Sequence, residues 1–405
     1  MTGTSVRVNP GSSPPSAVDV GLDSGARLAA HTTALREWIS AHSADLGAYR
    51  FRQPRSLAAA VEHDRGLLRL LHDAGWTRWG WSKASGGLGG PIVLRAVLYD
   101  ELAAADVELP EAFVILETLG PVLDEFAPAL AARHLNSYLS GQEMWGQGFS
   151  EPEAGSDLAH LRTRAAAVGQ GFVLDGQKTW MTLGQFAQYS AVLARTGSPD
   201  SGHRGLTMLW VDLRAPGVTV RPITASNGRD EFAEVYFDGV VVPSSAVIGA
   251  VGRGWDVAMF LLQYERGMYA WMRQAVLHRR LRAMTVGASV SGAPSAAFAA
   301  LGSAALAVAG LRARSAQTVR ALSDHLNPGP DISIDKVLLS TAEQAVFDAA
   351  RQLQPVGFAL ADSDAARVWR EEWFYSRASS IFGGAVDVQR DIIARLVLGL
   401  PRESR

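Results

Sequence analysis

The chain has 405 residues, of which 48% are hydrophobic, and its formal net charge at pH 7 is −2. A chain of this length is expected to form two or three domains or layers rather than one compact core. The near-neutral charge provides no bulk field that would favour nucleic acid or an anionic membrane. The chain has no cysteine, which excludes disulfides, iron–sulfur clusters, thiolate zinc sites and a cysteine nucleophile.

The nine histidines are scattered without metal-ligand spacing, so no metal site is expected. Residues 1–23 are rich in Pro, Ser and Gly and have no apolar stretch typical of a signal peptide, which predicts a disordered tail. The longest uncharged run, residues 285–311, is built from Ala, Gly and Ser rather than the Leu and Ile of a membrane span. We therefore expect a soluble cytoplasmic protein.

The hydrophobic period changes twice along the chain, which predicts an α+β multidomain protein. Residues 24–143 show helical spacing, as in "SLAAAVEHDRGLLRLLHDAG", where Gly75 is a plausible C-cap. Residues 144–250 consist of short β-branched and aromatic runs between Gly, Pro and Asp turns, typical of an all-β domain. Residues 251–405 return to long, Ala-rich helical patterns that suit a four-helix bundle.

Several stretches carry a family resemblance in a consistent order. "GFSEPEAGSDLAHLRTRA" followed by "GFVLDGQKTWMTLG" resembles the flavin-binding middle domain of the acyl-CoA dehydrogenase family. "GWTRWGWSKASGGLGGP", "EVYFDGVVVPSSAVIGAVGRGW" and "DVQRDIIARLVLGLPR" resemble the N-terminal loop, the end of the β domain and the C-terminal helix. The resemblance covers residues 25–402. It implies a helical N-terminal domain, a β-barrel or sandwich middle domain and a C-terminal four-helix bundle.

The resemblance also implies FAD as cofactor and an acyl-CoA thioester as substrate. The family contacts the pyrimidine side of the flavin at the positions of Gln147, Phe149 and Ser150. Trp180 and Thr182 occupy the strand that packs the ring and hydrogen-bonds near its N5. A hydroxyl and backbone N–H groups can stabilise charge on reduced flavin, and an indole shields it from water. Ser156 matches the family residue that lies near the pantetheine or phosphate arm of CoA.

The stretch "QYERGMYAWM" places Glu265 in an apolar helical stripe. Dehydrogenation removes a weakly acidic proton α to the thioester, and apolar surroundings make a carboxylate a stronger base. Most of the family carries this glutamate in a C-terminal Tyr-Glu-Gly turn, where this chain has Phe382 and Gly383. A minority carries it in a Glu-Arg step on an early bundle helix, which matches Glu265 and Arg266. We therefore expect Glu265 to be the base.

The neighbours of this base have expected roles of their own. Phe382 and Arg266 are expected to contact substrate, unless the arginine extends to solvent. The N–H of Gly383 is expected to donate to the thioester carbonyl, as in the family. The missing side chain at Gly383 is expected to leave space for a bulky or branched acyl group, such as a steroid side chain or a polyketide.

The chain departs from the family where most relatives bind the partner subunit's FAD pyrophosphate. Ala288 stands in the position of the arginine and Ser291 in that of the phenylalanine, while Gly292 and Pro294 are kept. Phosphates without their arginine are poorly compensated. The departure favours a heteromer in which a paralogous chain supplies the arginine. Such a complex would contain fewer FAD molecules than chains. The alternative is a homo-oligomer that binds FAD weakly or anchors its phosphates differently.

The adenosine-side motif is also altered. Gln354 and Gly357 are kept, whereas Phe358 replaces a glycine, Ala385 a threonine, and Asp387 the usual Glu or Gln. Three functions are compatible with these changes. The favoured one is an acyl-CoA dehydrogenase that passes electrons to an electron-transfer flavoprotein. The others are a flavin oxidase or monooxygenase on the same scaffold, and a non-catalytic subunit that only completes a partner's FAD site.

Overall fold

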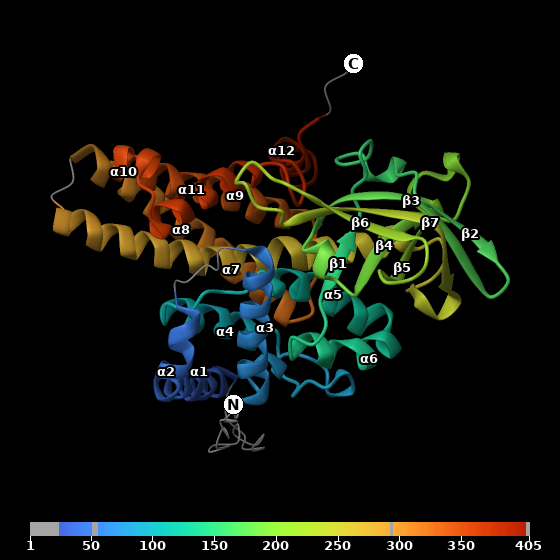
Figure 1. Ribbon diagram of the computed structural model, residues 1–405, viewed down its shortest axis with the longest axis horizontal. Coiled ribbons are helices and arrows are strands. Elements are labelled where there is room, and N and C mark those ends of the chain that lie inside the picture. The colour runs from blue at the N-terminus through green and yellow to red at the C-terminus, as the bar shows by residue number, and fades with distance from the viewer. Residues whose placement is uncertain (1–23, 51–55, 292–294, 402–405) are drawn as a thin grey trace, which may run out of the picture.

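The computed structural model describes residues 24–50, 56–291 and 295–401, and it divides into two helical regions and a sheet (Figure 1). The tail expected over residues 1–23 lies outside the described residues. The α, β, α order predicted from the sequence is confirmed. The helices of the first region are α1 (Ser24–Ala41), α2 (Ser43–Leu46), α3 (Leu57–Asp73), α4 (Val93–Ala104), α5 (Ala112–Phe126) and α6 (Pro128–Leu139).

Helix α3 shows how local sequence sets these boundaries. The Ser56 hydroxyl caps its start by accepting a hydrogen bond from the Ala59 N–H at 3.3 Å. Its buried stripe is Val61, Leu67, Leu68 and Leu71, at helical spacing. Gly75, two residues after the end, has a φ of 85°, a left-handed conformation that glycine adopts without a Cβ penalty.

The middle region is one mixed sheet with strand order β6-β7-β3-β2-β4-β5-β8, and β1 pairs in parallel with β4. Strands β4 and β5 are buried over most of their length, whereas β6 alternates between partly buried and exposed residues. The strands are β1 (Trp145–Gly148), β2 (Arg164–Val168), β3 (Gly171–Thr182), β4 (Tyr189–Arg195), β5 (Leu206–Asp212), β6 (Val218–Ile223), β7 (Phe232–Pro243) and β8 (Val247–Ile248).

Helix α7 is the long element that joins the three regions. It packs against α8 and α9 in the C-terminal bundle, α4 and α5 in the N-terminal region, and β5 in the sheet (Figure 1). The Trp271 indole N–H donates to the Ala96 carbonyl at 2.8 Å, which fixes α7 against α4. The helices of the last region are α7 (Gly254–Ser291), α8 (Ser295–Ser323), α9 (Ile332–Leu353), α10 (Pro355–Leu360), α11 (Asp364–Ala378) and α12 (Val386–Ile392).

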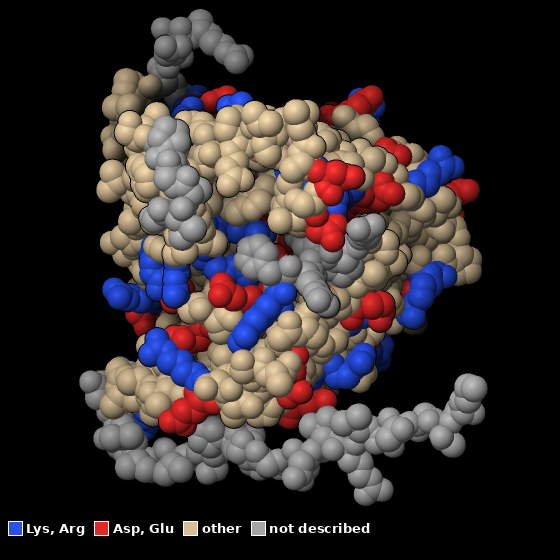
Figure 2. All heavy atoms as spheres, turned by 60° about the vertical axis from the view of Figure 1, so that its left-hand side comes forward, with Lys and Arg blue, Asp and Glu red and all other residues tan. Residues whose placement is uncertain are grey.

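Among the described residues, one helix, α8, is long and apolar enough to cross a membrane by length and composition. It packs on α7 and α9, and 28% of its most apolar window is buried in the chain. Phe298 and Leu306 on this helix are 42% and 77% exposed, which leaves an apolar face without a partner within the described part of the chain. On the face shown in Figure 2, acidic and basic side chains are intermixed rather than gathered by sign.

Candidate active site

Glu265 lies on α7 where the helix passes between the sheet and the bundle. Leu261 and Met268, one turn before and after it, are fully buried, and the glutamate is partly buried. The Gln147 amide, on β1, donates to Glu265 Oε2 at 3.2 Å. The carboxylate is therefore turned toward the sheet, and the structure brings together two residues that are 118 positions apart in the chain.

Gly383 meets the same carboxylate from the other side. A Cβ at Gly383 would lie 3.1 Å from Glu265 Oε1, tighter than ordinary contact, and its φ of 63° is left-handed. Glu265 and Gly383, the two positions at which the family resemblance leads us to expect a base, therefore lie next to each other. The expectation that the missing side chain leaves open space is corrected here, because the Glu265 carboxylate lies in that space.

Arg266 is turned toward the bundle rather than to solvent. Its Nε donates to the Gly383 carbonyl at 3.1 Å, and its Nη2 lies 3.1 Å from where a Cβ of Gly384 would be. Burial lowers the pKa of its guanidinium, an effect that the neighbouring Glu265 opposes. The arginine thus fixes the turn around residues 383 and 384, in which the N–H expected to hold the thioester carbonyl lies.

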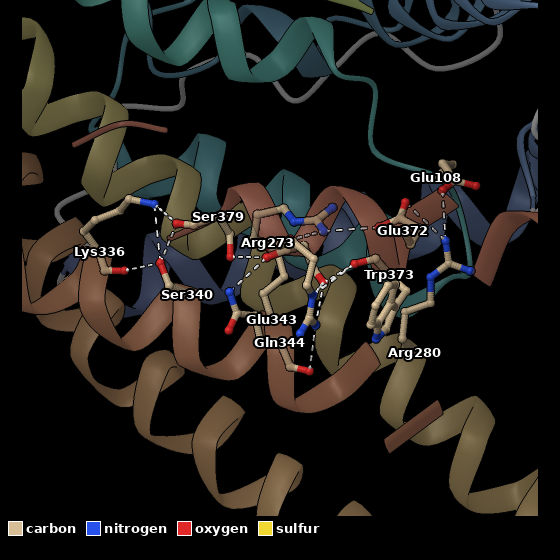
Figure 3. A network of polar contacts seen from close by, with 12 residues as sticks. Glu108, Arg273, Arg280, Lys336, Ser340, Glu343, Gln344, Glu372, Trp373 and Ser379 are labelled. Atoms are coloured by element: carbon tan, nitrogen blue, oxygen red, sulfur yellow. Dashed lines mark hydrogen bonds and ion pairs between the residues drawn. The ribbon is translucent and has the colours of Figure 1, made fainter. Parts of the chain in front are cut away.

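Lys336 is a residue of this site that the sequence pattern did not single out. It is 2% exposed and donates to the Ser379 carbonyl (Figure 3). Its ammonium lies 4.5 Å from the centre of the Phe382 ring. Burial lowers the pKa of Lys336 to about 8, against the attraction of Glu343 and Glu265. A signal was available, since only 3 of the 38 Lys and Arg residues are lysines, and burial shifts the pKa of a lysine readily whereas an arginine stays charged.

Trp180 has an uncommon backbone conformation. Its φ is 60°, a shift of register separates Lys178 from Met181 in the pairing of β3 with β7, and the indole is 57% exposed. A bulky residue with positive φ is strained, and such strain concentrates at functional sites. The Phe232 ring supports the indole edge-on at 5.8 Å. Thr182, at the end of the same strand, is partly buried.

The Phe149–Ser150 turn is fastened to β3 through its backbone. Lys178 Nζ donates to the Phe149 carbonyl at 3.0 Å and pairs with Glu151 at 2.8 Å, and the Thr179 N–H donates to the Ser150 carbonyl at 2.9 Å. Because the backbone is held from behind, the Phe149 and Ser150 positions are fixed relative to Trp180. An exposed indole beside a fixed turn with a hydroxyl suits a planar aromatic cofactor such as the flavin ring.

The residues expected to bind the adenosine side of FAD lie away from Glu265 and Trp180. A groove of about 350 Å³ is formed by α7, α9, α10 and α11, and Ala288, Gln354, Gly357 and Phe358 are among its lining residues. None of the described residues that line it is Lys or Arg. In Figure 1 this end of the bundle, marked by α10, lies far from β3. The Ser291 side chain, Gly292 and Pro294 lie outside what the structure describes.

Two other predicted contacts lie on the surface. Ser156 is exposed in the loop before β2, as suits a contact with a long CoA arm. Asp387 is exposed in the first turn of α12, where Arg390 lies 3.5 Å away. No described contact joins either residue to another predicted site residue. Groups of three or more residues able to hold a metal ion are absent from the described residues.

Comparisons with known proteins identify the family of the chain. Residues 146–240 match the middle domain of acyl-CoA dehydrogenases, and residues 252–398 match their C-terminal domain. Acyl-CoA dehydrogenase IpdE1 of Mycobacterium tuberculosis is 36% identical over 352 residues, which cover 85% of this chain and 90% of that protein. The homologue of the same name from Mycolicibacterium smegmatis is 35% identical over 358 residues.

Solved structures give the same result. The Tcur3481-Tcur3483 steroid ACAD superposes with a TM-score of 0.79 at 26% identity, over 95% of this chain and 100% of that chain. The ChsE4-ChsE5 complex from Mycobacterium tuberculosis superposes with a TM-score of 0.75 at 24% identity, over 95% and 100%. The second likeness shows the fold alone. By its two matched domains and its relatives, the chain belongs to the acyl-CoA dehydrogenase family of flavoprotein oxidoreductases.

Proposed function

We propose that this protein dehydrogenates an acyl-CoA thioester between its α and β carbons, with Glu265 as the base that removes the α-proton. The observation that carries the proposal is the convergence of Glu265 and Gly383, whose Cβ position lies 3.1 Å from the carboxylate. In this proposal, a carboxylate on α7 takes the place of the glutamate that most of the family carries in the C-terminal turn. When bound, FAD accepts the β-hydride, so the substrate loses one proton and one hydride and gains a double bond.

The residues around Glu265 have separable tasks in this proposal. The Gln147 amide orients the carboxylate by its hydrogen bond to Oε2. Arg266 fixes the Gly383 carbonyl, which presents the N–H groups of this turn to the developing negative charge on the thioester oxygen. The buried ammonium of Lys336 adds a positive charge behind the turn. Trp180 and Thr182 would pack the flavin ring, and Gln147, Phe149 and Ser150 would border its pyrimidine side.

A bulky, polycyclic acyl group is the substrate that we favour. One of the superposing proteins is a steroid ACAD, to which this chain is 26% identical. Phe382, Tyr269 and Tyr375 form an aromatic wall beside Gly383, with ring centres 5.7 to 6.1 Å apart. Such a wall can contact the flat face of a fused ring system next to the thioester.

Anaerobic bleaching of the bound flavin by a panel of acyl-CoAs tests this function. A fused-ring acyl-CoA should reduce the flavin faster than a straight-chain acyl-CoA of equal carbon number. If none of the acyl-CoAs bleaches the flavin, the result would favour the non-catalytic subunit. Reduced flavin that reacts with oxygen as fast as free flavin would favour the oxidase or monooxygenase. Transfer of electrons to an electron-transfer flavoprotein should follow in the dehydrogenase.

We further propose that FAD is shared between chains of a hetero-oligomer. The ring-side residues are on the sheet, whereas Gln354 and Gly357 lie at the far end of the bundle, so one chain does not surround one FAD (Figure 1). The groove at this far end is lined by Ala288 and by no described cation, so it lacks the charge that neutralises a pyrophosphate. A paralogous chain that carries the arginine would complete the site opposite this chain's ring-binding residues.

The number of FAD molecules per chain distinguishes the two assemblies. The protein purified with a neighbouring paralogue should contain one FAD for every two chains, and it should lose FAD when purified alone. Ala288→Arg should increase the FAD retained by the chain alone, because it restores a guanidinium to the groove. One FAD per chain in a stable homo-oligomer would overturn the shared site. Glu62→Gln, at a surface pair with Arg65, is the matched control.

A further inference from the structure

Lys336 is a buried cation that has no anion as its direct partner. Its side chain is 2% exposed on α9, and no carboxylate forms an ion pair with it in the described part of the chain. Its ammonium instead donates to the Ser379 carbonyl and, at 3.4 Å, to the Ser340 hydroxyl (Figure 3). A charge buried away from a counter-ion is costly, and such groups are concentrated at functional sites. The lysine therefore requires an explanation beyond packing.

The hydrogen bond to Ser379 does not by itself explain the lysine. The Ser340 hydroxyl is also buried, and it donates to the same Ser379 carbonyl at 2.5 Å. Loss of a donor is costly mainly when it leaves a buried acceptor without a partner. This carbonyl would keep its second donor if an apolar side chain replaced Lys336. A methionine could fill the same space, but it would not replace the positive charge.

The charged end of Lys336 lies beside the turn that contacts Glu265. The Lys336 Cε atom is 3.6 Å, and the Glu265 Oε1 atom 3.1 Å, from where a Cβ of Gly383 would be. The ammonium also lies 4.5 Å from the centre of the ring of Phe382, the residue before Gly383. The positive charge and the carboxylate thus lie around one glycine. The N–H expected to hold the thioester oxygen belongs to that glycine.

The charges that act on Lys336 come from α7 and α9. Burial has the largest effect and lowers the pKa of Lys336 to about 8, while Glu343 and Glu265 raise it and Arg266 lowers it. Glu343 is shared, because it forms an ion pair with Arg273. Further ionisable groups on the elements packed against α9 are paired, or are tyrosines whose pKa burial raises far above its usual range: Asp335 with Arg314 of α8, Asp348 with Arg377 of α11, Asp387 with Arg390 of α12, Tyr269 of α7 and Tyr375 of α11.

A positive charge in this place acts on the negative charge that moves during the proposed reaction. Before proton transfer that charge lies on the Glu265 carboxylate, and a nearby cation favours the ionised form that can act as a base. After proton transfer the charge lies on the thioester oxygen held at Gly383. A fixed cation in a site of low dielectric stabilises this charge without having to reorganise. Once Lys336 loses its proton, this stabilisation is lost while the turn keeps its hydrogen bond from Ser340.

We propose that Lys336 is a positioning residue that acts through the Gly383 turn: its ammonium stabilises the negative charge that passes from Glu265 to the thioester oxygen, and loss of its proton slows the reaction. This inference rests on the proposed function, since it takes Glu265 to be the base. It adds a dependence on pH that resides in a side chain behind the turn. The buried charge is then kept for the reaction at the expense of stability, as at other functional sites.

The rate of anaerobic flavin reduction, followed against pH, tests the proposal in the FAD-loaded protein with the acyl-CoA of the panel that bleaches it fastest. The wild-type rate should fall about tenfold as the pH rises through 8, because Lys336 then loses its charge. Lys336→Met should be about tenfold slower than wild type at pH 7 and show no such fall, so that the two rates converge by about pH 9.5. Two controls should keep the wild-type profile: Ser340→Ala, which removes a donor to the same carbonyl but no charge, and Lys83→Met, at an exposed lysine.

The outcomes separate this inference from the proposed function. If the wild-type rate does not fall above pH 8, or if Lys336→Met shows the same fall, Lys336 has no such role although Glu265 can still be the base. If no acyl-CoA of the panel bleaches the wild-type flavin, the proposed function fails and this inference fails with it.

Thermal unfolding tests whether Lys336 has a merely structural role. Because the folded pKa of Lys336 is lowered to about 8, the cost of its buried charge is present below pH 8 and is relieved as the pH rises through 8. Lys336→Met should therefore melt at a higher temperature than wild type at pH 6.5, and this difference should shrink above pH 8. A lower melting temperature at pH 6.5, together with equal slowing in Ser340→Ala, would assign Lys336 to structure and overturn the proposal.

Discussion

Glu265→Gln should slow anaerobic flavin reduction by an acyl-CoA by about 10²- to 10⁴-fold, the range that a positioned general base contributes. Glutamine keeps the size of the side chain and can still contact Gln147, but it has no basic oxygen to take the α-proton. Binding of acyl-CoA should change little, because the carboxylate acts on the proton rather than on the CoA arm. Stopped-flow absorbance of the flavin band measures the rate, and equilibrium titration measures the affinity.

A structural role for Glu265 makes a different prediction for the same variant. If the carboxylate only held α7 against β1, the variant would lose thermal stability and FAD together with activity. We expect its melting temperature and FAD content to match those of Glu62→Gln, in which a surface carboxylate is replaced. If Glu265→Gln reduced its flavin at the wild-type rate, Glu265 would have no role in the reaction.

Gly383→Ala should also have a large effect, although it adds a single methyl group. The new Cβ would lie 3.1 Å from Glu265 Oε1, and the left-handed φ of 63° disfavours any residue with a Cβ by about 1–2 kcal/mol. We expect a tenfold to hundredfold loss in the rate of flavin reduction, because a base displaced by a fraction of an ångström is misaligned with the α-proton. Gly399→Ala, at a φ of 66° with open space around it, is the matched control for backbone strain alone.

The double variant Glu265→Ala with Gly383→Glu carries this argument further. It moves the carboxylate to the family's more common position while keeping it near the same point in space. We expect its flavin reduction to exceed that of Glu265→Ala by at least tenfold. A double variant that folds and binds FAD but reduces it no faster than Glu265→Ala would show that the two positions do not serve the same proton.

The sequence predicted the fold, and it marked Glu265 and Gly383 as alternative positions of the base, because both inferences depend on local signals. Hydrophobic period distinguishes helices from strands, and the family motif marks both places where the base can occur. The direction of Arg266 was not predictable, since a helical residue next to a glutamate can face solvent or bundle. Its hydrogen bond to Gly383 is set by the packing of α7 against the turn after α11.

Other features of the site depend on long-range contacts that no sequence period records. Lys336 and Ser379 are 43 residues apart, and their contact exists only because α9 packs beside the end of α11. The strained φ of Trp180 arises from a shift of strand register, which alternation alone does not reveal.

Exchange of the α-hydrogen is the measurement that tests the role of Glu265 most directly. An acyl-CoA analogue with sulfur in place of its β-carbon keeps acidic α-hydrogens but has no β-hydride to give up. Incubated anaerobically in D₂O, the wild-type protein should exchange the α-hydrogens of this analogue for deuterium, and Glu265→Gln should exchange them at least 100-fold more slowly. Equally fast exchange by Glu265→Gln would contradict the assignment of the base.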